Sequence, residues 1–253
     1  MTTPPRSGQD TPQFRSAEHR THTAQAFRSG AREYADIRPG YPAEALDLLI
    51  DIEGPILDVG AGTGKLTEQL SGEVWALDPS RDMVKQLRAS ISVPVWQATA
   101  EDTALLAGAA AAVTSAQTWH WVEPVRASSE MDRIIKPGGA LVLLWNTLDV
   151  REPWVHRLTR IMHAGDIQKP GFYPEVHAPW QLAREVRTNW RQVLKAQDLF
   201  RLMSTRAYWL RNGEQVRQKM TSNLTWYLYE HLGFTPEQQI ELPYRCDAFR
   251  YKR

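Results

Sequence analysis

The sequence has almost no cysteine, since Cys246 is the only one among 253 residues. A single thiol excludes a disulfide within this chain, and Cys246 is most simply a core thiol. None of the seven histidines combines with a cysteine or a carboxylate at a metal-binding spacing such as H-E-x-x-H. The sequence therefore predicts neither a disulfide scaffold nor a metal site.

The sequence also lacks an excess of charge and a long apolar run. It has 30 basic and 29 acidic residues, a net charge of +1, which argues against a nucleic-acid surface. No apolar stretch approaches the span of a bilayer, and the N-terminus has no apolar core of a signal peptide. We expect a cytoplasmic protein with neither a nucleic-acid nor a membrane partner.

The length allows one large core, so one domain with insertions is expected rather than two independent domains. Residues 1–23 are polar and carry prolines without apolar periodicity, which predicts a flexible tail. We expect a single domain over residues 24–253.

A glycine-rich segment, ILDVGAGTGKLTEQ, runs from Ile56 to Gln69. Its first residues predict a buried strand, and Gly60, Gly62 and Gly64 allow the backbone to turn tightly and to approach a ligand closely. A helix beginning near Thr63 would point its free N–H groups at that ligand. The segment therefore predicts a site for a nucleotide-like molecule.

Spacing separates the possible glycine motifs. A phosphate-binding P-loop needs a glycine where Val59 stands and Ser or Thr where Leu66 stands. A dinucleotide fingerprint needs its third glycine at the position of Lys65, one residue after Gly64. A glycine turn that merely joins a strand to a helix is the remaining alternative.

Strands and helices alternate in the first part of the chain and predict a parallel sheet with right-handed crossovers. Helices are expected from Pro42, Ser80 and Pro124, the last ended by Pro137-Gly138-Gly139. Further strands are expected at 73–78, 93–98, 111–117 and 140–145.

Beyond Asn146 the chain is rich in tryptophan, and its apolar residues are spaced as in helices. We expect a helical cover over residues 147–199 and 207–239, with strands at 200–206 and 240–251. The aromatic residues favour an apolar or aromatic acceptor site, although they are also compatible with an interface, so a monomer and a homodimer both remain possible.

The segment from Asp58 to Gly64, acidic-x-G-x-G-x-G, resembles the first motif of the class I S-adenosylmethionine (SAM) dependent methyltransferases. Asp78 follows twenty residues after Asp58, at the end of the second strand, where a carboxylate can accept both ribose hydroxyl hydrogen bonds. The resemblance implies an α/β, Rossmann-like fold: a mostly parallel seven-stranded sheet with an antiparallel last strand, plus a helical cover. It implies SAM as cofactor and S-adenosylhomocysteine as product, with a lid over residues 24–42 and a SAM-binding core over residues 43–146.

The resemblance also implies a set of cofactor contacts along the ends of the first four strands. Thr99 stands where the family usually has an adenine-contacting aspartate, which leaves the Ala100 N–H and Glu101 or Asp102 as candidates. The residues implied in cofactor binding are Asp58, Gly60, Ala61, Gly62, Gly64, Asp78, Pro79, Met83, Ala100, Glu101, Ala116 and Gln117.

Residues 26–42 resemble the N-terminal lid of a subgroup that includes trans-aconitate and cantharidin methyltransferases, with the pattern Y-x-x-x-R-P-x-Y-P. Tyr34 and Arg38 could grip the cofactor carboxylate, and Tyr41 could face the sulfonium. The alternative is a proline-fixed turn packed by Tyr34 and Tyr41.

Methyl transfer needs positioning and exclusion of water more than acid–base chemistry. His120 is the candidate catalytic residue, as a clamp for a carboxylate acceptor or a base for a hydroxyl acceptor, although it could be structural. The expected acceptor-side residues are Tyr41, Trp119, Trp121, Trp145 and Asn146.

We therefore expect a methyltransferase acting on a small molecule, at oxygen. A nicotinamide-dependent oxidoreductase and a non-catalytic SAM-binding protein are the alternatives. A nucleic-acid or protein methyltransferase is disfavoured by the neutral charge and by AQTWHW, from Ala116 to Trp121, in place of an Asn-Pro-Pro-aromatic motif.

Overall fold

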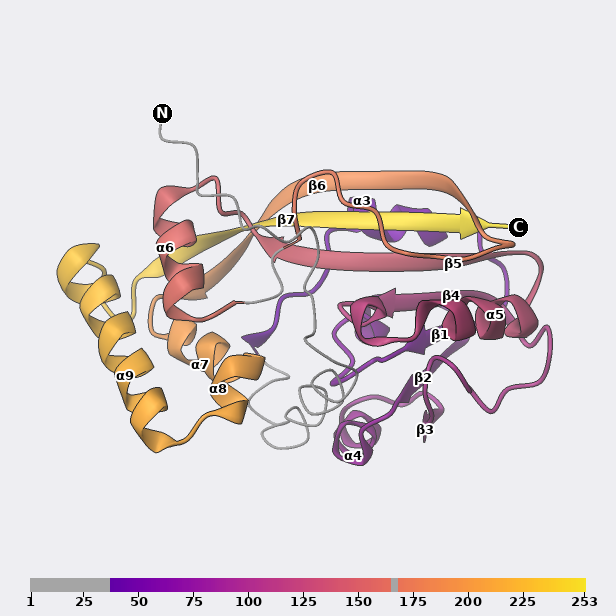
Figure 1. Ribbon diagram of the computed structural model, residues 1–253, viewed down its shortest axis with the longest axis horizontal. Helices are drawn as coiled ribbons and strands as arrows, with labels where there is room; N and C mark the ends of the chain where they lie inside the picture. Colours follow the sequence, from indigo (N-terminus) through magenta and orange to yellow (C-terminus); the bar gives the residue numbers. More distant parts are fainter. Residues whose placement is uncertain (1–36, 165–167) are drawn as a thin grey trace. The chain divides into compact units, whose positions relative to one another are not determined.

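The computed structural model describes residues 37–164 and 168–253 (Figure 1). The predicted tail and most of the predicted lid, including Tyr34, lie outside the described residues. The chain forms two compact units. The sheet unit comprises Pro39–Asn146, Tyr173–Thr188 and Cys246–Arg253. The helical unit comprises the described parts of Met1–Arg38, Thr147–Phe172 and Asn189–Arg245.

A seven-stranded sheet has the order β3-β2-β1-β4-β5-β7-β6. Parallel ladders join β1 to β2 and β4, β2 to β3, and β4 to β5. All four residues of β1 are buried, as expected for a central strand covered on both faces. The first four strands are β1 (Ile56–Val59), β2 (Val74–Asp78), β3 (Val95–Gln97) and β4 (Ala110–Ala116).

Three long strands carry the chain between the two units. They are β5 (Ile135–Leu148), β6 (Gln181–Lys195) and β7 (Gln239–Lys252). β5 and β6 run from the sheet unit into the helical unit, whereas β7 runs back, so the last strand is antiparallel to its neighbours (Figure 1). The predicted seven-stranded sheet with an antiparallel last strand is confirmed.

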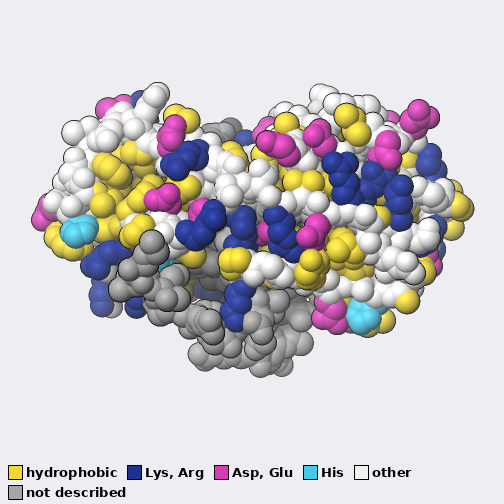
Figure 2. Space-filling model, turned by 90° about the horizontal axis from the view of Figure 1, so that it is seen from above, with side chains coloured by type: hydrophobic (Ala, Val, Ile, Leu, Met, Phe, Trp, Pro, Cys, Tyr) yellow, Lys and Arg dark blue, Asp and Glu magenta, His cyan; other side chains and the backbone are white. Residues whose placement is uncertain are grey.

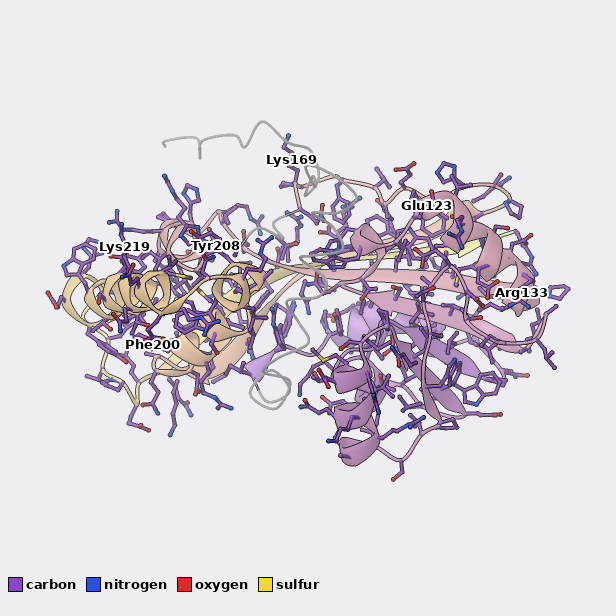
Figure 3. The ribbon with its side chains drawn as sticks, turned by 60° about the horizontal axis from the view of Figure 1, so that its bottom comes forward. Glu123, Arg133, Lys169, Phe200, Tyr208 and Lys219 are labelled. Carbon is purple, nitrogen blue, oxygen red and sulfur yellow. The ribbon has the colours of Figure 1, made fainter. Side chains whose placement is uncertain are left out.

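The helices of the sheet unit begin where the sequence places caps. Ser80 accepts a hydrogen bond from the Met83 N–H at the start of α4 (Arg81–Ser90). Glu123 likewise caps α5 (Pro124–Ile134), which has proline at its first position; Glu123 and Arg133 are labelled in Figure 3. A single turn, α3 (Ala43–Leu46), and a 3₁₀ turn (Asp47–Leu49) follow Pro42.

Three local predictions in this unit are wrong. No α-helix begins near Thr63, because the glycines keep positive φ angles and only a 3₁₀ turn (Thr67–Gln69) forms. Pro137-Gly138-Gly139 lies within β5 rather than ending α5, which stops at Ile134. The spacing after Pro42 predicts Leu46, Leu49 and Ile50 on one apolar face, but Ile50 is 82% exposed.

The helical unit contains α6 (Pro153–Ile161), α7 (Asp198–Ser204), α8 (Ala207–Arg211), α9 (Glu214–Thr225) and a π-helical turn (Trp226–His231). These helices share a hydrophobic core with the C-terminal ends of β5 and β6 and the N-terminal end of β7. This core includes Val155, Leu202 and Leu224, all fully buried. Among the described residues, no helix is both long and apolar enough to span a membrane.

Two predictions for this region are wrong. Residues 181–195 form β6 rather than part of the helical cover, and residues 200–206 fall mainly in α7 rather than in a strand. The buried positions of α7, Leu199, Leu202 and Met203, have helical i, i+3, i+4 spacing. β6 has almost no buried face, so it carries no alternating apolar pattern that could have identified it as a strand.

Candidate functional site

The predicted site residues of the sheet unit follow the carboxyl ends of adjacent strands. The glycine turn follows β1, Asp78 ends β2, and residues 117–121 follow β4. Trp145 and Asn146 lie near the end of β5. In open α/β sheets this edge is where ligands bind.

The three glycines of the turn have different surroundings. All have positive φ, at +70° for Gly60, +58° for Gly62 and +93° for Gly64. A methyl group added at Gly60 would lie 2.2 Å from Thr118 Cγ2, and one added at Gly64 would lie 2.5 Å from Leu87 Cδ1. The same addition at Gly62 meets nothing within 4 Å. Gly60 and Gly64 are thus needed for packing, whereas Gly62 borders open space.

Asp58 braces the turn from within. It is 1% exposed, and its two carboxylate oxygens accept hydrogen bonds from Thr67 Oγ1 at 2.6 Å and Thr114 Oγ1 at 3.1 Å. Burial outweighs these bonds and raises the pKa of Asp58 to about 6. The carboxylate fixes the glycine turn to β4 and to the 3₁₀ turn that follows.

Asp78 holds the opposite side of the turn. Its Oδ2 accepts the Gly62 N–H at 2.9 Å, and its Oδ1 accepts the Ser80 N–H at 2.8 Å. Burial raises the pKa of Asp78 to about 6. Because a carboxylate has about four acceptor positions, two remain for ribose hydroxyls after these bonds.

The residues expected beside adenine are also ordered by the sheet unit. Met83 and Ala100 are buried, at 4% and 5% exposed. The Pro79 carbonyl accepts a hydrogen bond from Gln97 Nε2 at 3.0 Å. Glu101 Oε1 accepts the Glu123 N–H at 2.7 Å, which ties this loop to the start of α5.

Gln117, directly after Ala116 at the end of β4, has a strained backbone, and only one end of its side-chain amide is hydrogen-bonded. Its φ of +54° is uncommon for a residue with a side chain. Its Nε2 donates to the Asn146 carbonyl, which fixes the amide orientation. Gln117 Oε1 is then buried with no hydrogen-bond partner in the described part of the chain. Such an orphaned acceptor fits a cationic or N–H-bearing ligand group.

The aromatic segment after β4 is held by its indole nitrogens. Trp119 is 3% exposed, and its Nε1–H donates to the Glu175 carbonyl at 2.8 Å. Trp145 Nε1 lies 3.3 Å from His120 Nδ1, and the His120 and Trp121 rings are 5.0 Å apart. Since an indole N–H can only donate, Nδ1 of His120 is the acceptor and the neutral ring carries its proton on Nε2.

The end of the predicted lid is anchored through its backbone. Gln69 forms a pair of bonds with Tyr41, accepting from its N–H at 2.7 Å and donating to its carbonyl at 2.9 Å. Asn146 Nδ2 donates to the Gly40 carbonyl at 2.7 Å. Sequence reasoning missed Gln69, whose only signal was its position just after the glycine motif.

Arg38 belongs to the helical unit, where its Nη2 donates to the Thr205 carbonyl at 2.8 Å. Tyr34 lies outside the described residues. The grip on the cofactor carboxylate stays a prediction. Within the described ranges, no cluster of three or more His, Cys, Asp or Glu could hold a metal ion.

Comparisons with known proteins agree with this geometry. Residues 57–143 match the family model described as a methyltransferase domain. The fold, the glycine turn and the buried acid at the end of β2 define a class I SAM-dependent methyltransferase, and the chain belongs to this family. SAM is its cofactor.

An uncharacterized methyltransferase of Mycobacterium tuberculosis is 37% identical over 226 residues, which cover 87% of this chain and 92% of that protein. An uncharacterized methyltransferase-like protein of Schizosaccharomyces pombe is 27% identical, covering 88% of this chain and 93% of that protein. A solved structure of a putative type II methyltransferase from Anaeromyxobacter dehalogenans has a TM-score of 0.56 at 21% identity, covering 84% of this chain and 97% of that one. The likeness of residues 26–42 to the trans-aconitate group stays a prediction.

Proposed function

We propose that the enzyme transfers the SAM methyl group to an oxygen atom of a small molecule, and that this oxygen belongs to a carboxylate. The observation that carries the proposal is the hydrogen bond from Trp145 Nε1 to His120 Nδ1. A neutral His120 so held has a proton on Nε2 and presents a donor. A donor orients a carboxylate, whereas a base for a hydroxyl acceptor would need a lone pair there.

The size and polarity of the acceptor follow from the surroundings of His120. The Trp121 ring lies 5.0 Å from the His120 ring, and Trp145, which is 2% exposed, contacts Nδ1 of His120. The net charge of +1 offers no broad basic surface for a nucleic acid. A small molecule with an apolar body and one carboxylate fits these properties.

The cofactor roles follow from the hydrogen-bonding capacity of the residues. Asp78 would accept hydrogen bonds from the ribose hydroxyls, and Gln117 Oε1 would accept one from the ammonium group of the methionine part. Gly62 would allow the backbone to approach the cofactor closely. Bound SAM would supply an electrophilic methyl carbon: its bond to a carboxylate oxygen forms as its bond to sulfur breaks, and S-adenosylhomocysteine is the leaving group. The remaining requirement on the protein is alignment of the two reactants and exclusion of water.

A panel of carboxylic acids, phenols, alcohols and amines tests the proposal, with S-adenosylhomocysteine release as the readout. We expect turnover with carboxylic acids and a product that releases methanol in mild alkali, as methyl esters do and ethers do not. Turnover with phenols or amines alone would contradict the carboxylate assignment. SAM binding without turnover of any acceptor would favour the non-catalytic alternative.

Two substitutions of His120 separate a donor from a base. His120→Gln keeps an N–H donor, whereas His120→Ala removes it. If His120 orients the acceptor, the glutamine variant keeps most of the turnover and the alanine variant loses roughly 10-fold to 100-fold. Equal loss in both variants, with unchanged SAM affinity, would indicate a base instead.

A further inference from the structure

β6 is the outermost strand of the sheet and is unusually open. It is 15 residues long, and only Leu194 is buried. Two of its apolar side chains are well exposed, Leu182 at 41% and Val193 at 60%. An outermost strand presents backbone N–H and C=O groups along its outer edge, which can pair with another strand.

The sequence of β6, QLAREVRTNWRQVLK, is nearly a mirror image of itself about Thr188. In an antiparallel pair of two copies with a two-fold axis at Thr188, each residue faces the residue equally far on the other side of it. The facing pairs are then Gln181 with Lys195, Leu182 with Leu194, Ala183 with Val193, Arg184 with Gln192, Glu185 with Arg191, Val186 with Trp190, and Arg187 with Asn189.

This register matches side chains of like polarity. Three facing pairs are apolar, Glu185 faces Arg191, and no two like charges face each other. An axis at Asn189 would place Arg187 opposite Arg191, and an axis at Arg187 would place Leu182 opposite Gln192. Facing pairs of matched type stabilise a sheet, and like charges destabilise it, so the axis at Thr188 is favoured.

Basic residues on an outermost strand ordinarily prevent self-pairing, but here three of the four, Arg187, Arg191 and Lys195, have acidic partners in their own chain. Arg187 pairs with the buried Asp247 at 2.9 Å, and Lys195 pairs with Glu237 at 2.6 Å. Figure 2 looks from the side on which β6 is uppermost in Figure 1, and shows dark blue basic side chains interspersed with acidic and apolar ones. Pairing therefore does not bring two uncompensated basic rows together.

We propose that this protein forms a symmetric homodimer in which β6 pairs in antiparallel fashion with β6 of a second copy, with Thr188 on the two-fold axis. The pairing joins the two sheets edge to edge and satisfies backbone groups on both strands. Gln192 of the same strand donates to the Ile37 carbonyl at 3.1 Å, so the interface lies next to the end of the predicted lid.

Sedimentation equilibrium of the full chain and disulfide cross-linking through one introduced cysteine test the proposal. We expect a dimer, and we expect Thr188→Cys to form a covalent dimer under mild oxidation, because each Cα lies about 4.5–5.5 Å from its copy across the axis. Val193→Cys is the matched control: Val193 is more exposed than Thr188 but faces Ala183 in this register, so it should not cross-link to itself. Cys246, the only native thiol, is fully buried and gives no background.

A charge exchange tests the register independently. Glu185→Lys and Arg191→Glu should each weaken dimerisation about tenfold, and the double variant should restore it, because the cross-strand pair occurs twice per dimer. Each single variant also loses contacts in its own chain, Glu185 with Arg187 and Arg191 with Glu152 and Glu241, which the double variant cannot regain. A monomer, or a dimer insensitive to these changes and without the Thr188→Cys cross-link, would overturn the proposal.

Discussion

The glycine turn of the sheet unit and the aromatic cluster of the helical unit, formed by Arg157, Trp226 and Tyr227, hold their polar groups in different ways. In the turn, Asp58 and Asp78 are almost fully buried and accept short, directional hydrogen bonds. In the aromatic cluster, the Arg157 guanidinium lies 5.5 Å from the Trp226 ring centre and 5.7 Å from that of Tyr227. Such cation–π contacts tolerate small shifts of the two groups far better than hydrogen bonds do.

The same contrast continues through the helical unit. The His163 and Tyr208 rings stack 3.9 Å apart, and Phe200 lies 6.0 Å from Tyr229; Phe200 and Tyr208 are labelled in Figure 3. The cofactor region is therefore specified atom by atom, whereas the helical unit is specified mainly by apolar packing. Substitutions should have large effects in the first region and small effects in the second.

The largest effect is expected at Gly60. Gly60→Ala should lower the free energy of unfolding by about 3 kcal/mol, because the new methyl group overlaps Thr118 and the positive φ is unfavourable for alanine. Gly62→Ala is the control, with similar backbone strain but open space around the methyl group, and should cost about 1 kcal/mol. Urea unfolding measures both, and equal losses would show that backbone strain alone matters.

Asp58→Asn should stabilise the protein at neutral pH. The pKa of Asp58 is raised from 3.8 to about 6, so its contribution to stability is greatest below pH 3.8 and is lost as the pH rises through 6. Removing the charge should raise the free energy of unfolding by up to about 3 kcal/mol at pH 8 and by little at pH 4. Urea unfolding of the wild type and the variant between pH 4 and pH 8 measures the difference in their free energies of unfolding, which should grow with pH. A difference that is constant with pH would show that burial does not raise the pKa of Asp58.

Asp78→Ala should weaken SAM binding by about 1–3 kcal/mol, through loss of the ribose hydrogen bonds and of the bond that orients the Gly62 N–H. Calorimetric titration of the folded variant with SAM and S-adenosylhomocysteine gives the measurement. An unchanged dissociation constant would remove Asp78 from the cofactor site.

The smallest effect is expected in the aromatic cluster. Arg157→Gln should lower the free energy of unfolding by about 0.5–1 kcal/mol, because the cation lies over a Trp226 ring that is 42% exposed. SAM affinity should not change. A loss as large as that at Gly60 would show that the helical unit is as closely specified as the glycine turn.

The sequence was most informative where burial and backbone geometry act together. β1, β2 and β4 are short apolar runs bounded by glycine, proline or polar residues, and they were predicted to within a few residues. β6 was not, because an outermost strand exposed along both faces needs no apolar alternation. α7 was mistaken for a strand although Leu199, Leu202 and Met203 have helical spacing, because its seven residues make only about two turns.

At the candidate site, the residue types were more predictable than their partners. The glycines and Asp78 have chemistry that spacing alone reveals. The bond between Trp145 and His120 joins residues 25 positions apart, one in β5 and the other in the 3₁₀ turn that follows β4. The orphaned Gln117 Oε1 depends on a side-chain orientation set by Asn146. Contacts of this kind arise from tertiary packing, which no local pattern records.

The hydrogen-bonded Asp78 also makes cofactor capture a proton-linked equilibrium. Its pKa of about 6 lies close to that of Asp58, so at mildly acidic pH a fraction of both groups carries a proton. A cationic ligand favours the ionised carboxylates, and binding it below pH 6 should therefore expel protons into the solvent. The heat of titration would then depend on the ionisation enthalpy of the buffer, and that dependence counts the protons released.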